Sequence, residues 1–124
     1  MRRPYKNEKF IEICNKMKAA RKDLAITTDV IVGYPGETEE DYLMTKETMR
    51  DIGFDNAFIF RYSQRRNTPA SDRLDQISET VKEERNQDLL AMVNQIAIDK
   101  NELLVGTTQE VLCTGGSKKD PNRL

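Results

Sequence analysis

The residue types that most often do chemistry in proteins are scarce in this sequence of 124 residues. It has no histidine, and its two cysteines, Cys14 and Cys113, lie near opposite ends of the chain. Structural zinc usually takes four Cys or His ligands and a cubane iron–sulfur cluster at least three cysteines, so one copy completes neither. Catalytic dyads and triads that depend on histidine are excluded as well. We therefore predict no catalytic residue, no metal ligand and two unreactive thiols.

Asp29 is the first candidate binding residue, because it stands alone in an apolar segment, 25–33. The β-branched composition of that segment predicts a central strand buried in a parallel sheet. A buried carboxylate is costly unless it is hydrogen-bonded or paired, so Asp29 needs polar surroundings. Strand side chains alternate between two faces, which puts Ile31 and Gly33 on the same face as Asp29. We expect this face to line a cavity and the opposite face to meet helices.

A second apolar segment, 57–62, predicts a neighbouring parallel strand, reached by a connection long enough for a helix. The same alternation, with the aromatic residues assigned to the helix side, points Phe58 and Phe60 at helices and Arg61 at the cavity of Asp29. Two interpretations of Asp29 and Arg61 remain open: contact with a bound ligand, or a structural ion pair across the cavity.

Gly33 and Gly36 flank the turn that follows the first predicted strand. Backbone N–H groups at such a strand-to-helix turn can bind an anion or the polar edge of a cofactor. A tight turn that uses the two glycines only for their backbone geometry is the simpler interpretation.

The charge balance limits any contact with nucleic acid to a local one. Lys and Arg number 20 against 21 Asp and Glu, a net charge of −1, which argues against binding by bulk positive charge. Arg65 and Arg66 are the local candidates, in a polar loop, 63–77, that is long enough to be functional. They either meet RNA phosphates or are ordinary solvated surface residues.

Three helices are predicted around these strands. Asn7 is expected to cap the first helix, and Thr38 the second helix, which ends at Gly53. Ser78 is expected to cap a long third helix that runs to Gly106. The spacing of apolar residues predicts that the first two helices bury Phe10, Ile13, Cys14, Met17, Leu43, Met49 and Ile52. Alternating residues over 107–113 predict an antiparallel strand that opens a different architecture.

The fold class is therefore α/β with a βαβ unit, within one domain at most. Two parallel strands make a smaller sheet than usual, so we expect missing neighbours upstream of the first residue. No signal peptide and no apolar stretch long enough for a membrane are present in the sequence, which predicts a cytoplasmic chain without a membrane partner.

Segment 28–41, TDVIVGYPGETEED, closely resembles the tRNA methylthiotransferases of the radical S-adenosylmethionine superfamily. Further segments match that family in order along essentially the whole chain: MRRPY at 1–5, GFDNAF at 53–58, TPA at 68–70, KEER at 82–85 and VGTTQEV at 105–111. The tail, SKKDPNRL at 117–124, resembles the branch that modifies N6-dimethylallyladenosine beside the anticodon. One departure is SQRRNTPA at 63–70, where the family usually has a Pro-Arg-Pro-Gly stretch.

The resemblance implies that residues 1–104 are the C-terminal part of a partial (β/α) radical S-adenosylmethionine barrel, and that 105–124 begin an RNA-binding TRAM β-barrel. It implies an enzyme that uses S-adenosylmethionine and [4Fe–4S] clusters to methylthiolate tRNA, not DNA. Asp29, Ile31, Gly33 and Arg61 would then be cofactor-binding residues. The family's C-x3-C-x2-C loop is absent, so we expect the chain to hold no cluster and to be inactive alone.

Two other functions remain open on the sequence. The chain could be a non-catalytic RNA-binding or interaction module, either a remnant or a split-gene partner that docks on a separately encoded N-terminal part of the same protein. It could also be an α/β domain without activity.

Overall fold

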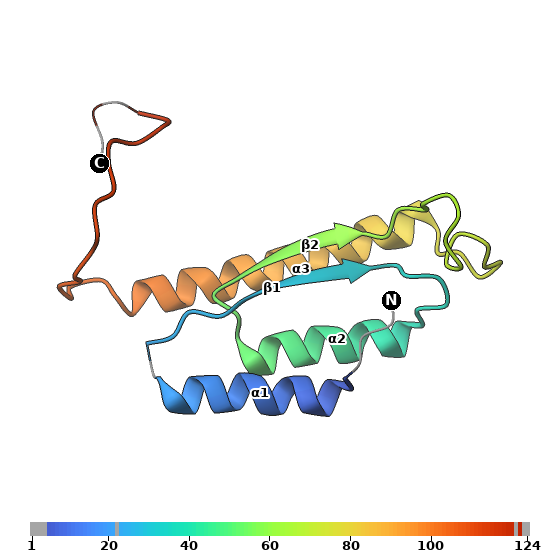
Figure 1. Cartoon of the computed structure of the whole chain (residues 1–124), viewed down its shortest axis with the longest axis horizontal. Helices are drawn as coiled ribbons and strands as arrows, with labels where there is room; N and C mark the ends of the chain where they lie inside the picture. The colour runs from blue at the N-terminus through green and yellow to red at the C-terminus, as the bar shows by residue number, and fades with distance from the viewer. Residues whose placement is uncertain (1–4, 22, 121, 123–124) are drawn as a thin grey trace.

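The computed structural model describes residues 5–21, 23–120 and 122. Their order along the chain is α1 (Asn7–Ala20), β1 (Thr27–Val32), α2 (Glu39–Ile52), β2 (Asn56–Arg61) and α3 (Glu79–Glu102) (Figure 1). The two strands pair in parallel, as expected for strands joined through a helix. The predicted α/β class with a βαβ unit is confirmed.

Both ends of α2 and the start of α3 follow the predicted capping signals. Thr38 and Asp41 form a reciprocal capping box at the start of α2, and Gly53 ends that helix in the left-handed conformation. The Ser78 hydroxyl accepts a hydrogen bond from the Val81 amide at the start of α3. At α1 the prediction was wrong: Lys6 is the N-cap, and Asn7 instead donates from Nδ2 to Thr48 Oγ1 of α2, 3.2 Å away.

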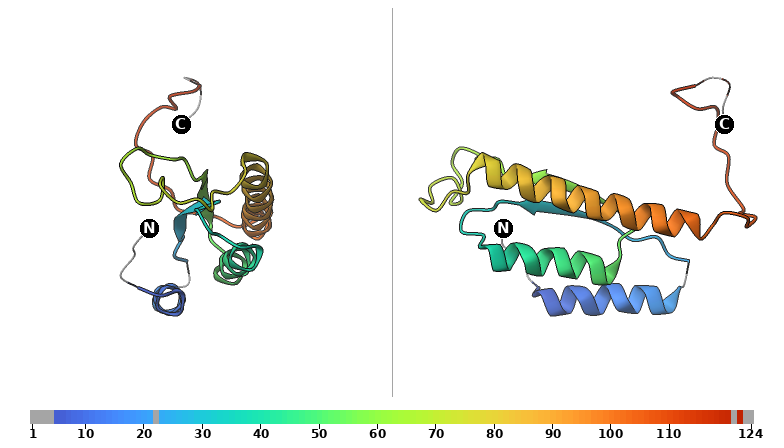
Figure 2. Two further views of the ribbon diagram at one scale, coloured as in Figure 1. Left: turned by 90° about the vertical axis from the view of Figure 1, so that its right-hand side faces the viewer. Right: turned by 180° about the vertical axis from the view of Figure 1, so that it is seen from behind.

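The sheet has one covered face and one open face. Helices α2 and α3 lie on the same side of the two strands, and α1 packs beside α2 (Figure 2). Register partners in a parallel pair share a face, and the covered face carries Thr28, Val30 and Val32 opposite Ala57, Ile59 and Arg61. The open face carries Asp29 and Ile31 opposite Phe58 and Phe60.

The prediction for the second strand was therefore inverted. Phe58 and Phe60 are 59% and 52% exposed, whereas Ala57 is 6% exposed and lies in the core. The physical reason is the close approach of α3, whose Asn86 Nδ2 donates to the Ile59 carbonyl at 2.9 Å. A small alanine fits under a helix at that distance, and the large rings turn to the other side.

The core lies between the covered face and the helices. Its buried members include Cys14 of α1, Met49 and Ile52 of α2, and Leu89 of α3. Ile13, Met17 and Leu43 are 43%, 42% and 46% exposed, contrary to prediction. Helical spacing identifies rows of apolar residues but not which row meets the neighbouring helix, and α2 buries Tyr42 in place of Leu43.

The C-terminal segment departs from the sequence prediction. Helix α3 ends at Glu102 rather than at Gly106, and no strand forms over 107–113. Strands need a hydrogen-bonded neighbour, and no part of the chain that the structure describes pairs with this segment. Val111 and Leu112 are consequently more than four-fifths exposed. Over the same described residues, no helix has the length and apolar character to cross a membrane.

Candidate functional site

The open face of the sheet carries two of the predicted site residues, Asp29 and Ile31. Asp29 is exposed there, beside a shallow hollow that is lined by Tyr5, Thr27, Thr28, Asp29 and Phe58. Because Phe58 and Phe60 are their register partners, the face combines a carboxylate with two exposed aromatic rings. Such a surface suits a ligand with both a planar apolar part and polar groups.

Arg61 does not share this face. Its register partner is Val32, and its guanidinium forms an ion pair with Glu83 of α3, so the side chain lies on the helix side of the sheet. The predicted common cavity of Asp29 and Arg61 is therefore wrong, for the same reason that Phe58 and Phe60 were misplaced. An ion pair between Asp29 and Arg61 across a cavity is also excluded, since they lie on opposite faces.

The backbone amides of the turn after β1 donate hydrogen bonds to other groups of this chain. Gly33 N donates to both carboxylate oxygens of Glu37, at 3.0 and 3.1 Å, and Glu37 N donates to the Tyr34 carbonyl at 2.9 Å. Gly36 N donates to the carbonyl of Asp75, 2.9 Å away. Gly33 and Gly36 have φ of 72° and 81°, the left-handed region that favours glycine. The geometry thus supports the structural interpretation of the two glycines over an anion site.

Loop 63–77 docks on this turn through Asp75. It leaves the carboxyl end of β2 and returns to the start of α3 at the right of Figure 1. Asp75 also pairs with Arg73, whereas Arg65 and Arg66 are exposed and form no ion pair within the described residues. Contact of Arg65 and Arg66 with RNA stays a prediction.

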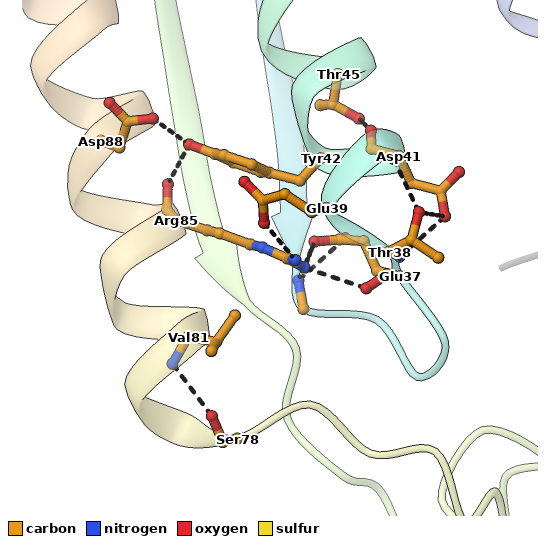
Figure 3. Close-up of polar contacts among 11 residues, drawn as sticks. Glu37, Thr38, Glu39, Asp41, Tyr42, Thr45, Ser78, Val81, Arg85 and Asp88 are labelled. Atoms are coloured by element: carbon orange, nitrogen blue, oxygen red, sulfur yellow. Dashed lines mark hydrogen bonds and ion pairs between the residues drawn. The ribbon is translucent and has the colours of Figure 1, made fainter.

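Two buried cations of α3, Lys82 and Arg85, lie against the turn that follows β1. The sequence analysis assigned them no role. Lys82 is 3% exposed and its ammonium lies 5.5 Å from the centre of the Tyr62 ring, while Arg85 is 7% exposed and pairs with Glu37 and Glu39 (Figure 3). Burial lowers the pKa of the Arg85 guanidinium, but its hydrogen bonds to Glu39 and Glu37 outweigh that effect and leave the pKa above its ordinary value. The sequence does contain a signal for this burial, because helical spacing puts Lys82 and Arg85 on the same helix face as the apolar Leu89 and Val93.

The residues present do not fit an iron–sulfur cluster. Cys14 is 3% exposed within the core, and Cys113 lies in the exposed C-terminal segment. Among the described residues, no group of three or more His, Cys, Asp or Glu side chains is arranged to hold a metal ion. The open face does fit the mixed character of S-adenosylmethionine, with Asp29 for polar groups and Phe58 or Phe60 for an aromatic base.

Sequence comparisons identify the relatives of this chain. Over all 124 residues it is 64% identical to a protein of Akkermansia muciniphila named tRNA-2-methylthio-N(6)-dimethylallyladenosine synthase. The chain is homologous to a part of these synthases. Synthases of the same name from Methylacidiphilum infernorum and Opitutus terrae are 48% and 47% identical over 99% and 95% of the chain. No protein-family model matches it.

The chain spans about a quarter of the length of these synthases: 27% of the Akkermansia protein, 26% of the Methylacidiphilum protein and 25% of the Opitutus protein. The resemblance found in the sequence is confirmed.

Proposed function

We propose that this chain is a segment of a tRNA methylthiotransferase that adds a methylthio group to N6-dimethylallyladenosine in tRNA, beside the anticodon. The observation that carries the proposal is the 64% identity, over the whole chain, to a synthase named for that product. Residues 1–104 would contribute the C-terminal part of a radical S-adenosylmethionine barrel, and 105–124 the start of a TRAM domain. Action on tRNA would place the enzyme in the cytoplasm.

The two faces of the sheet support a role within a barrel. In a (β/α) barrel each parallel strand turns one face to covering helices and the other to the interior. The βαβ unit here has that asymmetry: α2 and α3 cover the side of Val32 and Ala57, and the side of Asp29 and Phe58 is open. In the complete enzyme the open face would line the interior.

The proposal gives different roles to the four predicted cofactor-binding residues. Asp29 and Ile31 would contact S-adenosylmethionine or the substrate base directly. Gly33 would act through the turn that it begins, because its amide is already bonded to Glu37. Arg61 would hold β2 against α3 through Glu83. The [4Fe–4S] clusters, which start the radical chemistry when S-adenosylmethionine is bound, would be held by cysteines outside this chain, so the chain alone would be inactive.

A non-catalytic RNA-binding module is the second candidate function. The observation that favours it is the exposed pair Arg65 and Arg66, which have no carboxylate partner within the described part of the chain. Direct binding of tRNA by the chain alone, weakened by Arg65→Gln with Arg66→Gln, would support this alternative.

A chimera tests the proposal. Residues 1–124 replace the homologous quarter of the Akkermansia synthase, and tRNA that carries N6-dimethylallyladenosine is digested and analysed by mass spectrometry after the reaction. We expect methylthiolated nucleoside at a rate within about tenfold of the parent synthase, since 64% identity keeps most internal contacts. A folded chimera that makes no methylthiolated nucleoside would contradict the proposal.

A further inference from the structure

The strand-to-helix turn after β1 is organised around a single carboxylate. Glu37 accepts the Gly33 amide with both of its oxygens, and the Glu37 side chain is only 15% exposed. A carboxylate that is this well shielded needs a cation, because removing an unpaired charge from water is strongly unfavourable. The turn itself supplies amides but no cation.

Arg85 supplies that cation from α3. Its Nη1 lies 2.6 Å from Glu37 Oε1 and 3.3 Å from the Glu37 carbonyl oxygen, and its Nη2 lies 3.0 Å from Glu39 Oε2 (Figure 3). One planar guanidinium thus ties the end of β1 and the first turn of α2 to α3, three elements in all. A lysine ammonium has no such fork and could not hold all three acceptors in the same way.

The guanidinium is itself held in place. It lies 5.1 Å from the centre of the Tyr42 ring, and the Tyr42 hydroxyl contacts both the Arg85 carbonyl, at 3.4 Å, and the carboxylate of Asp88. With the side chain 8% exposed, Arg85 has little freedom to leave Glu37. This buried arrangement differs from the exposed pairs elsewhere, such as Arg21 with Asp23, whose side chains are 71% and 72% exposed.

From this geometry we propose that Arg85 is a positioning residue: by holding Glu37 on the Gly33 amide, it fixes the end of β1 and thereby the placement of Ile31 and Asp29 toward the ligand. The inference rests on the proposed function for the identity of that ligand. It assigns Arg85 no contact with the ligand. Arg85 acts through Glu37 and Gly33.

The chimera with the Akkermansia synthase allows a direct test. Arg85→Gln, Arg85→Lys and Glu37→Gln are compared with the matched exposed control Arg21→Gln. Hydrogen exchange of the peptide that covers 33–38 is followed by mass spectrometry, and KM for S-adenosylmethionine and kcat are measured from methylthiolated tRNA. We expect Arg85→Gln to increase the exchange rate of this peptide about tenfold and KM about tenfold, because a shielded charged hydrogen bond is lost. The kcat of the variant should stay within about twofold of the parent chimera.

The other variants sharpen the result. Arg85→Lys should give an intermediate KM, because the charge remains, and the double variant with Glu37→Gln should change KM by less than the product of the single effects. Arg21→Gln should change neither exchange nor KM. Unchanged hydrogen exchange in Arg85→Gln would overturn the positioning role, and so would faster exchange with an unchanged KM. In either case the proposed function still stands as long as the parent chimera is active. An inactive parent chimera would overturn the proposed function first, and the ligand-positioning role with it.

Discussion

The side chain of Lys82 occupies the space where any residue other than glycine at position 33 would put its Cβ. An ideal Cβ on Gly33 would lie 2.3 Å from Lys82 Cγ and 3.1 Å from Cδ. The contact is with the buried stem of Lys82, not with its flexible end, and Lys82 is 3% exposed. Gly33 is therefore required by its neighbour on α3 as well as by its φ of 72°.

Gly33→Ala should consequently cost more than an ordinary glycine replacement at positive φ. The left-handed conformation costs an alanine roughly 1–2 kcal/mol, and the clash with Lys82 adds about 1–3 kcal/mol. Gly53→Ala is the matched control, because its φ is 59° and the nearest atom to an added Cβ is 3.7 Å away. Urea unfolding of both variants checks this. Equal losses of unfolding free energy would show that Lys82 does not constrain Gly33.

The two faces of the sheet should respond differently to truncation. Phe60 is 52% exposed on the open face and Leu89 is 0% exposed beneath the covered face. Phe60→Ala should lower the free energy of unfolding of the chain by less than about 1.5 kcal/mol, and Leu89→Ala by about 2–5 kcal/mol. Thermal melting with urea titration measures both. The reverse order would mean that the assignment of the faces is wrong.

Asp55 makes part of the stability depend on pH. Its carboxylate accepts the Ile26 amide at 2.8 Å and the Lys100 ammonium at 2.8 Å, which joins the loop before β1 to the end of α3. Burial raises the pKa of Asp55, but the hydrogen bonds from Lys100 and Ile26 outweigh it and leave the pKa below its ordinary value. A depressed pKa means that the stabilisation is present above the ordinary value, about 4, and is lost as pH falls through the lower folded value.

Asp55→Asn should therefore be less stable than the parent by about 1–2 kcal/mol at neutral pH, and the difference should shrink as the pH falls below the ordinary pKa of a free aspartate, about 4. Urea unfolding at a series of pH values measures it, with exposed Asp51→Asn of α2 as the control. A difference that grows as the pH falls would contradict the sign of the effect.

Much of this fold was predictable because its signals are local. The capping box at Thr38, the glycine that ends α2 and the β-branched run of β1 each depend on a few neighbouring residues. The face of β2 was not predictable in the same way. Large aromatic residues are usually buried, and only the closeness of α3, which leaves room for Ala57 but not for Phe58, reverses that preference.

The candidate site was likewise predictable only where its signals are local. Alternation placed Asp29 and Ile31 correctly on one face, because β1 has an unambiguous apolar side. The Arg85 contact with Glu37 joins residues 48 positions apart and depends on how α3 crosses the sheet, so no local pattern contains it.

The proposed function requires that the open face of the sheet, and not the helix-covered face, meets the ligand. The measurement is KM for S-adenosylmethionine, with thermal melting alongside, for Asp29→Asn and Arg61→Gln in the chimera with the Akkermansia synthase. Because Asp29 is exposed on the open face, Asp29→Asn should raise KM by roughly tenfold with little change in melting, as expected when one charged hydrogen bond to a ligand is lost. Arg61→Gln should leave KM within about twofold, because its partner is Glu83 of α3. A raised KM for Arg61→Gln with an unchanged KM for Asp29→Asn would show that the helix-covered face, and not the open face, meets the ligand.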